Sequence, residues 1–245
     1  MLKPAWLSEP LEELEEEPTE ELALGTLAAN FWLLELFEVR ARAGLLERAA
    51  PERLPSLSPL SELLAEDLRH LGELSKPYSA GPRAWLSPLL REGLSRALAR
   101  EAEVVEAFHV AILEPTLAAL LSFLSARTSL PLTLRYAPEE AEHSAKALEA
   151  LRRPYVAGLE EAMVKFLEEN TLLLFASAFA EEGGRSSLLR LLGCATTGEE
   201  ASGALAELYA QIDAARASAC KSLFGPSSGV VTLVSEYGLA KRGLC

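Results

Sequence analysis

The stretch TEELALGTLAANFWLLELFEVRARAGLLERAA, residues 19–50, decides the fold class. Thr19 can cap a helix, and the two glutamates that follow it favour the positive end of the helix macrodipole. The centre of the stretch, FWLLELF at 31–37, is apolar on nearly every side. We therefore expect a long helix near the middle of a hydrophobic core, ending before Pro51.

The helical pattern continues after this stretch, punctuated by proline and glycine. Ser58-Pro59 and Ser87-Pro88 each place a capping serine before a proline at the first helical position. The helix that follows Ser87 is expected to run to about Glu114, where Pro115 kinks or restarts it.

The C-terminal half has the same punctuation. Pro138 is expected to start one helix, and Pro154 another that continues to a stop at Gly183-Gly184. A short helix is then expected over 187–194 and a longer one over 197–224, which opens on a capping-box pattern.

Two stretches break the helical pattern. TSLPLTLRY at 128–136 has alternating leucines, which predicts a short strand or an extended crossover, and the β-branched SSGVVTLVS at 227–235 predicts a strand that pairs with it. The expected fold class is mostly α, a multi-helix bundle-like array with at most one short two-stranded β element. The expected organisation is an acidic N-terminal arm at 1–18, a helical domain at 19–226 with a soft boundary at 126–138, and a short strand and tail at 227–245.

Composition and charge exclude several classes of function. The net charge is −13, and acidic surfaces repel nucleic acid and anionic lipid, so neither is an expected partner. Three widely spaced cysteines argue against a disulfide framework and a structural zinc site. No secretory signal is evident, and the longest charge-free apolar runs fall short of the ~20 residues that cross a bilayer, so we expect a cytoplasmic protein. Scarce amides beside abundant glutamate indicate a thermophilic source or GC-rich codon bias.

One pattern with chemical potential involves the three histidines. Each follows a carboxylate by three residues, a spacing that places both side chains on one face of a helix. Glu-x-x-His from two helices, with a glutamate from each of two others, holds two iron or manganese ions in helical bundles. The pairs are Asp67/His70, Glu106/His109 and Glu140/His143.

This pattern has a metal interpretation and a structural one. In the first, the metal ligands are Glu106, His109, Glu140 and His143, with further carboxylates drawn from Glu35, Glu38, Glu161 and Glu168. In the second, the acids are incidental, because 36 of 245 residues are acidic and Glu140 lies in a first helical turn, where acids belong. Leu68 and Leu71 flank His70 as core residues would, which favours a solvated His70.

The absence of a strong active-site signature favours a non-enzymatic helical interaction or regulatory subunit of an intracellular complex. A protein partner or a homo-oligomer is then expected, with no cofactor and no catalytic residue. The alternative is a ferritin-like di-metal carboxylate protein with a di-iron or di-manganese centre. A third hypothesis, an apolar ligand pocket lined by Phe31, Trp32 and Phe37, has no polar anchor.

Overall fold

A computed structural model describes residues 19–74, 86–152, 158–171, 181–194 and 199–242. Within these ranges the chain is helical and contains no strand, which confirms the mostly-α fold class. The expected arm at 1–18, Pro154 and the start of the expected capping box at 197 lie outside the described residues. The expected domain division stays a prediction.

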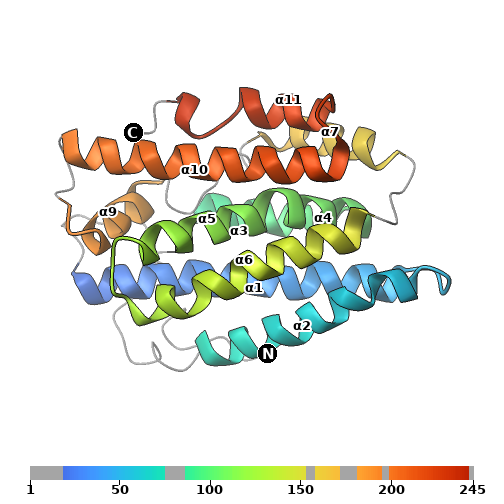
Figure 1. Cartoon of the computed structure of the whole chain (residues 1–245), viewed down its shortest axis with the longest axis horizontal. Helices are drawn as coiled ribbons and strands as arrows, with labels where there is room; N and C mark the ends of the chain where they lie inside the picture. Colours follow the sequence, from blue (N-terminus) through green and yellow to red (C-terminus); the bar gives the residue numbers. More distant parts are fainter. Residues whose placement is uncertain (1–18, 75–85, 153–157, 172–180, 195–198, 243–245) are drawn as a thin grey trace.

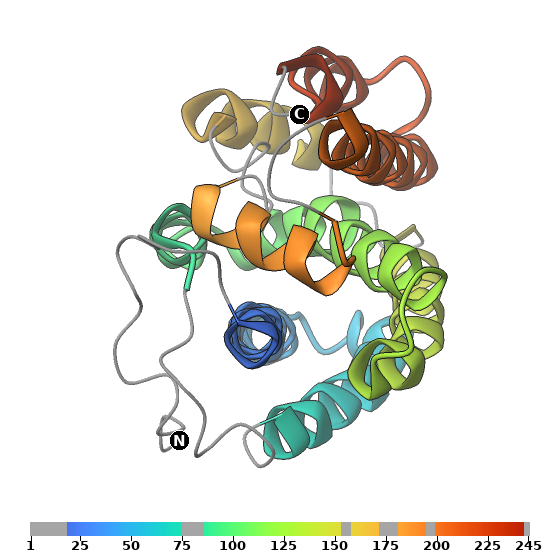
Figure 2. The same ribbon diagram turned by 90° about the vertical axis from the view of Figure 1, so that its left-hand side faces the viewer.

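The helix α1 (Glu20–Arg48) passes through the middle of the molecule. Its cap is the expected one, since the Thr19 hydroxyl accepts a hydrogen bond from the Leu22 amide at 3.2 Å. Seen end-on in Figure 2, α1 lies inside an arc of other helices, and it packs on α2, α4 and α9. Burial on nearly every side explains why its sequence is apolar all round.

The other helices form two layers (Figure 1). α2, α4 and α9 pack on α1, and α6 packs on α2 and α5. α10 packs on α5 and on α11, which also contacts α7. The bounds are α2 Leu54–Leu74, α3 Pro88–Ala97, α4 Ala102–Phe108, the π-helical η2 His109–Leu113, α5 Glu114–Ser125, α6 Pro131–Arg152, α7 Leu159–Glu169, α9 Glu182–Leu191, α10 Glu199–Phe224, α11 Gly229–Glu236 and the 3₁₀ helix η3 Ala240–Arg242.

The two Ser-Pro pairs behave differently. Ser87 caps α3 through the Leu90 amide at 3.0 Å, with Pro88 first in the helix, as expected. The expectation for Pro59 is wrong, because α2 begins at Leu54 and Pro59 lies inside it. Proline lacks the amide that would bond the carbonyl four residues back, and the Ser58 hydroxyl donates to that carbonyl, the Pro55 oxygen, at 3.1 Å.

The long helix expected from Ser87 to Glu114 is interrupted. α3 ends at Ala97, and a tight turn follows in which the Arg100 amide donates to the Ala97 carbonyl at 2.9 Å. Residues 99–101 are exposed, so no apolar side chain holds them in a continuous helix. The chain restarts at α4, and Pro115 then lies in the first turn of α5, as one of the two expectations had it.

Both expected strands are wrong. In the 128–136 stretch, Leu132 and Tyr136 are buried while Leu134 is 54% exposed, so the buried side chains have the helical spacing of four. This stretch enters α6 at Pro131, and Pro138 lies inside the helix instead of starting it.

The second expected strand, 227–235, is helical too. Ser228 caps α11 through the Val230 amide, and Val230, Val231 and Val234 are buried beneath α7 and α10. Valine disfavours helices only weakly, so burial of one helical face outweighs its β preference.

The Gly183-Gly184 pair does not stop a helix, because both glycines lie in the first turn of α9, after Glu181 as N-cap. α9 therefore replaces the short helix expected over 187–194. The helix expected over 197–224 matches α10, which ends before Gly225 with its φ of 91°.

Two segments, Glu20–Arg48 and Ala102–Ser125, are long and apolar enough to cross a membrane by length and composition. Their most apolar windows are 72% and 83% buried within the protein, as expected for core helices of a soluble fold as well.

Candidate metal centre

A cluster of buried ionisable side chains lies between α1, α2, the α4–η2–α5 segment and α6. It contains all three histidines of the chain, and each member is at most 3% exposed. The members are Glu35, Glu38 and Arg42 from α1, Asp67 and His70 from α2, Glu106, His109 and Glu114 from α4, η2 and α5, and Glu140 and His143 from α6.

Helical spacing brings these side chains onto the inner faces of four helices. Residues three or four apart share a helix face, and this relation holds for Glu35, Glu38 and Arg42 along α1. The three acid-x-x-His pairs use the same geometry on the other helices. Each of the four helices thus contributes a row of polar side chains on an inward face that is otherwise apolar.

Glu114 joins the cluster through the π-helical turn η2. In an α-helix, a residue five positions after His109 would point about 140° away from it. The amide of Glu114 instead donates to the carbonyl of His109, the i to i+5 bond of a π-helix, so both side chains lie on one face. Single π turns of this kind are frequent at functional sites.

Three sets of side chains in the cluster bring potential ligand atoms within 4.8 Å of one another. We call His70, Glu140 and His143 the outer group, and Glu38, His109 and Glu114 the inner group. A third set, Glu35, Glu38 and Asp67, shares Glu38 with the inner group and lies against His70 of the outer group through Glu35.

In the outer group, each histidine has one nitrogen facing inward. His70 Nδ1 lies 3.1 Å from Glu35 Oε1 and 3.5 Å from Glu140 Oε1, while its Nε2 lies 2.8 Å from Glu139 Oε2. His143 contacts Glu66 through Nε2, and its Nδ1 is buried without a hydrogen-bond partner. The two rings are stacked, with centroids 5.5 Å apart.

The same arrangement recurs in the inner group. His109 Nε2 lies 3.2 Å from Glu38 Oε1 and 3.6 Å from Glu114 Oε1, and its Nδ1 lies 3.5 Å from Glu106 Oε2. The Phe37 ring packs edge-on against the imidazole, with centroids 6.1 Å apart. His109 therefore turns Nε2 toward the two carboxylates of its group and Nδ1 toward a third.

Arg42 is the cation that contacts the inner group. Its guanidinium forms ion pairs with Asp67 and Glu114, and lies 3.7 Å from both Glu38 and Glu106. One side chain thus contacts carboxylates from α1, α2, α4 and α5, and it is fully buried.

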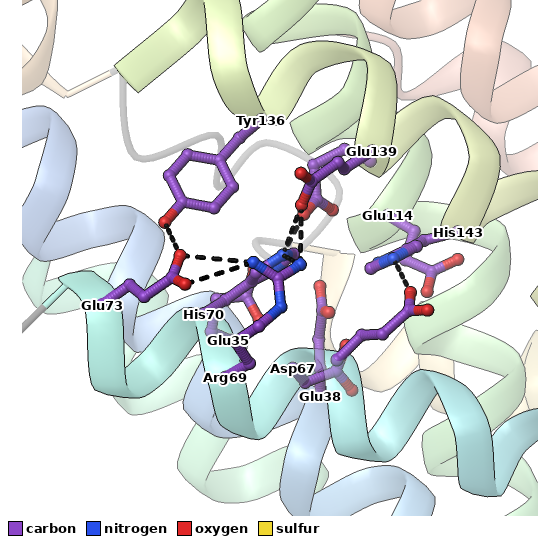
Figure 3. A network of polar contacts seen from close by, with 12 residues as sticks. Glu35, Glu38, Asp67, Arg69, His70, Glu73, Glu114, Tyr136, Glu139 and His143 are labelled. Atoms are coloured by element: carbon purple, nitrogen blue, oxygen red, sulfur yellow. Dashed lines mark hydrogen bonds and ion pairs between the residues drawn. The ribbon is translucent and has the colours of Figure 1, made fainter. Parts of the chain in front are cut away.

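The outer group lies beneath a half-exposed polar rim between α2 and α6, shown in Figure 3. Glu66 and Glu139 are 39% and 35% exposed, and Arg69 donates to Glu139 at 2.9 Å. The Tyr136 hydroxyl donates to Glu73 at 2.9 Å, and its ring packs edge-on against His70. Glu66 and Glu139 thus connect the buried outer histidines to the partly exposed rim.

Many buried polar atoms of the cluster have no hydrogen-bond partner. Such atoms are rare in folded proteins and indicate a missing partner. They include both carboxylate oxygens of Glu38, Glu106 and Glu140, one oxygen each of Glu35, Asp67 and Glu114, both ring nitrogens of His109, and Nδ1 of His143.

The burial and crowding of the carboxylates raise the pKa values of several of them. Burial, followed by repulsion from neighbouring acids, raises the pKa of Glu35 and of Glu140 well above the ordinary value. Burial raises the pKa of Asp67 to about 7, although Arg42 opposes the shift. Burial would lower the pKa of His109, but Glu38 and Glu106 outweigh it and raise the pKa to about 9. Protons therefore compensate part of the charge of the cluster.

The pKa values of the two outer histidines shift in the opposite direction to that of His109. Burial lowers the pKa of His70 and of His143, so both imidazoles are neutral at pH 7. A neutral imidazole whose Nε2 proton is donated to Glu139 or Glu66 presents the Nδ1 lone pair to the interior, and this is the form that binds metal ions.

The structure brings together most, but not all, of the residues suggested by the sequence. Glu106, His109, Glu140 and His143 all lie in the cluster, and so do the suggested helpers Glu35 and Glu38. Glu161 and Glu168 lie exposed on α7, so that suggestion is wrong. The expected solvation of His70 is also wrong, since His70 is fully buried and Leu68 is 46% exposed.

Sequence reasoning missed Glu114, Arg42 and the rim glutamates Glu66 and Glu139. Arg42 carried a usable signal, because it follows Glu38 by four residues in an apolar helix, where an isolated charge needs a partner. Glu114 carried none, because its spacing from His109 is meaningful only in a π turn.

Comparison of the chain with protein-family models, with curated proteins and with solved structures finds no match in any of the three. The geometry of the cluster is therefore the basis on which a function is proposed below.

Proposed function

We propose that this protein is a di-metal carboxylate protein that holds two iron or manganese ions between α1, α2, α4–α5 and α6. The single observation that carries the proposal is the set of buried carboxylate oxygens and imidazole nitrogens that converge without hydrogen-bond partners. Carboxylate and imidazole together are the donor set of such centres in helical bundles.

Charge supports two ions rather than one. A histidine that binds a metal ion is neutral, so Arg42 is then the one buried cation of the cluster. It faces six buried carboxylates, a difference of five negative charges when all are ionised: Glu35, Glu38, Asp67, Glu106, Glu114 and Glu140. Two divalent ions supply four positive charges and leave one negative charge. Burying the acids without cations is costly, and the raised pKa values of Glu35 and Glu140 reflect that cost.

The assignment of ligands follows from the inward-facing atoms. His70 Nδ1, His143 Nδ1 and Glu140 would hold one ion, and His109 Nε2, Glu38 and Glu114 the other, with Glu35 and Asp67 between them. Bound iron or manganese supplies redox chemistry that none of these side chains has.

The interaction or regulatory subunit expected from the sequence rested on the lack of convergent polar groups. The buried cluster removes that argument, and the metal reading becomes the better supported of the two. Association with a protein partner or a second copy stays a separate prediction, and it is compatible with a metal centre.

Elemental analysis of the purified full-length chain tests the proposal. Protein produced with iron and manganese supplied should contain close to two of these ions per chain. His109→Ala should remove the inner ion and His143→Ala the outer one, and the double variant should contain neither. Each variant deletes a nitrogen ligand and adds no charge to the interior.

Glu161→Gln and Glu168→Gln are the matched controls, because both glutamates are exposed on α7. They should leave the metal content unchanged. A wild-type chain that contains no iron or manganese, and takes up neither when it is added under anaerobic conditions, would overturn the proposal.

A further inference from the structure

We propose that the two metal positions fill in a fixed order, the outer before the inner, because Arg42 occupies the inner ligands until an ion displaces it. This inference rests on the proposed di-metal function. Its physical basis is the unequal surroundings of the two groups.

Arg42 contacts the inner group directly. It pairs with Glu114, lies 3.7 Å from Glu38, and is anchored on the far side by Asp67. An ion at the inner position must compete with the guanidinium for Glu114 and bear the repulsion of its positive charge. The fork of the guanidinium engages several carboxylates at once, so its displacement breaks several ion pairs together.

The outer group has no such competitor among its inward-facing atoms. Both oxygens of Glu140 and Nδ1 of His143 lack hydrogen-bond partners, and Arg69 lies on the rim side of His70. Arg42 forms its ion pairs with Glu38, Asp67, Glu106 and Glu114, none of which belongs to the outer group. Two imidazoles also bind a transition-metal ion more strongly than the single imidazole of the inner group.

Access favours the same order. Glu66 and Glu139 are partly exposed and contact the outer histidines, whereas every inner-group residue and Arg42 is at most 1% exposed. An ion that enters between α2 and α6 meets the rim carboxylates and then the outer group. The inner position lies behind the outer one on this route.

Calorimetric titration of the metal-depleted full-length protein with Co²⁺ tests the order. We expect two binding events of one ion each, with dissociation constants at least about tenfold apart, because like-charge contact with Arg42 weakens the second. His70→Ala should abolish the tight event, and His109→Ala should abolish only the weak one. Loss of the tight event in His109→Ala would overturn the order.

Arg42→Met tests the role of the arginine, since methionine preserves much of the bulk and removes the charge. The weak event should tighten by at least about tenfold, so that the two events approach each other. Arg40→Met is the matched control, because Arg40 is exposed on the same helix and should change neither event.

Arg42→Lys provides a second test of the role of the arginine if Arg42→Met does not fold. A lysine preserves one charge but cannot bridge several carboxylates, so its weak event should fall between those of wild type and Arg42→Met. A weak event unchanged in the folded Arg42 variants would overturn the inference and leave the di-metal function intact. A wild-type protein that binds no Co²⁺ would instead count against the proposed function itself.

Discussion

Each buried imidazole is held on one side by a glutamate that lies outside the three candidate ligand sets. Glu139 contacts His70, Glu66 contacts His143, and Glu106 contacts His109. Such carboxylates fix the tautomer and the orientation of a ligating histidine and raise its basicity. In the proposed di-metal centre, Glu106, the acid of one sequence pair, would therefore be a positioning residue and not a ligand.

This arrangement predicts the effect of Glu106→Gln and Glu139→Gln. An amide can still accept the imidazole proton, but it carries no charge, so metal affinity should fall by about 10- to 100-fold. The stoichiometry at saturating metal should not change. Titration with Mn²⁺ followed by electron paramagnetic resonance checks both quantities, with Glu161→Gln as the exposed control; affinities equal to that of wild type would contradict the positioning role.

Metal affinity should also rise with pH. His109 has a pKa of about 9 and Asp67 one of about 7, so protons must leave these groups before an ion binds. Between pH 6 and pH 9 the affinity of the inner position should increase, and the protein should release protons on binding. Titrations in buffers of different ionisation enthalpy measure that release; a pH-independent affinity in this window would contradict it.

Among individual residues, the sequence predicted many members of the buried cluster, while their binding of metal stays a prediction. The i, i+3 rule found all three acid-x-x-His pairs, and the apolar setting of Glu35 and Glu38 marked them as buried. The i, i+3 rule could not find Glu114, because the π turn that aligns Glu114 with His109 depends on tertiary structure. It misplaced His70 because Leu68 was assumed to be buried, and tertiary packing buried His70 instead.

Among the helices, proline has a different effect at different positions. Pro88 begins α3, where its missing amide would be unpaired in any case, while Pro59 lies inside α2 and leaves the Pro55 carbonyl to the Ser58 hydroxyl. The sequence motif around the two prolines is the same. Only the three-dimensional context distinguishes them, which is why the start of α2 was mispredicted.

The difference predicts opposite responses to substitution. Pro59→Ala should raise the melting temperature, because an amide would replace the hydroxyl as donor to the Pro55 carbonyl and the interior proline penalty of up to ~3 kcal/mol would be relieved. Pro88→Ala should leave it unchanged or slightly lower, since proline is favourable at the first helical position. Thermal denaturation of both variants checks this, and a destabilised Pro59→Ala would contradict the interior position of Pro59 as the cause of a penalty.

The two mispredicted strands share a cause. Both were inferred from leucine alternation or β-branched residues over nine positions, a window too short to separate a strand from one buried helix face. Burial of Leu132 with Tyr136, and of Val230 with Val234, decided in favour of helices. Long segments such as α1 and α10 were predicted well, because many turns contribute to the helical period.

For the whole molecule, the cluster makes stability depend on pH when metal is removed. Asp67 holds its proton to about pH 7 in the folded state but has an ordinary pKa of 3.8, so stability falls as pH rises between these values. His109, with an ordinary pKa of 6.5 and a folded value of about 9, loses its contribution between those two values. Glu38, whose pKa is lowered, adds stability that is complete above its ordinary value of 4.5, so it does not reverse the trend.

Burial lowers the pKa of His70 and His143, so both add stability that is complete above their ordinary pKa of 6.5. The metal-depleted protein should therefore have a melting temperature that falls from about pH 6.5 to pH 9. Metal-loaded protein should show a smaller fall, because bound ions take over the compensation of the carboxylates and stabilise the folded state by mass action. Thermal denaturation of both forms across this range is the measurement. His109→Ala is the informative variant, since the fall between about pH 6.5 and pH 9 should shrink in it; a metal-depleted protein that gains stability in this range would contradict the account.

The central place of α1 has a consequence for how the chain is made. This helix leaves the ribosome before the other described helices, yet α9, which packs on it, ends at Leu191, 143 residues after Arg48. At about 5–20 residues per second, an apolar helix with buried acids waits roughly 7 to 30 s for α9. During that time α1 presents to the surroundings the same surface that passes for a membrane-spanning segment. Nascent chains halted before α9 should therefore recruit chaperones or aggregate, while chains completed through α10 should not.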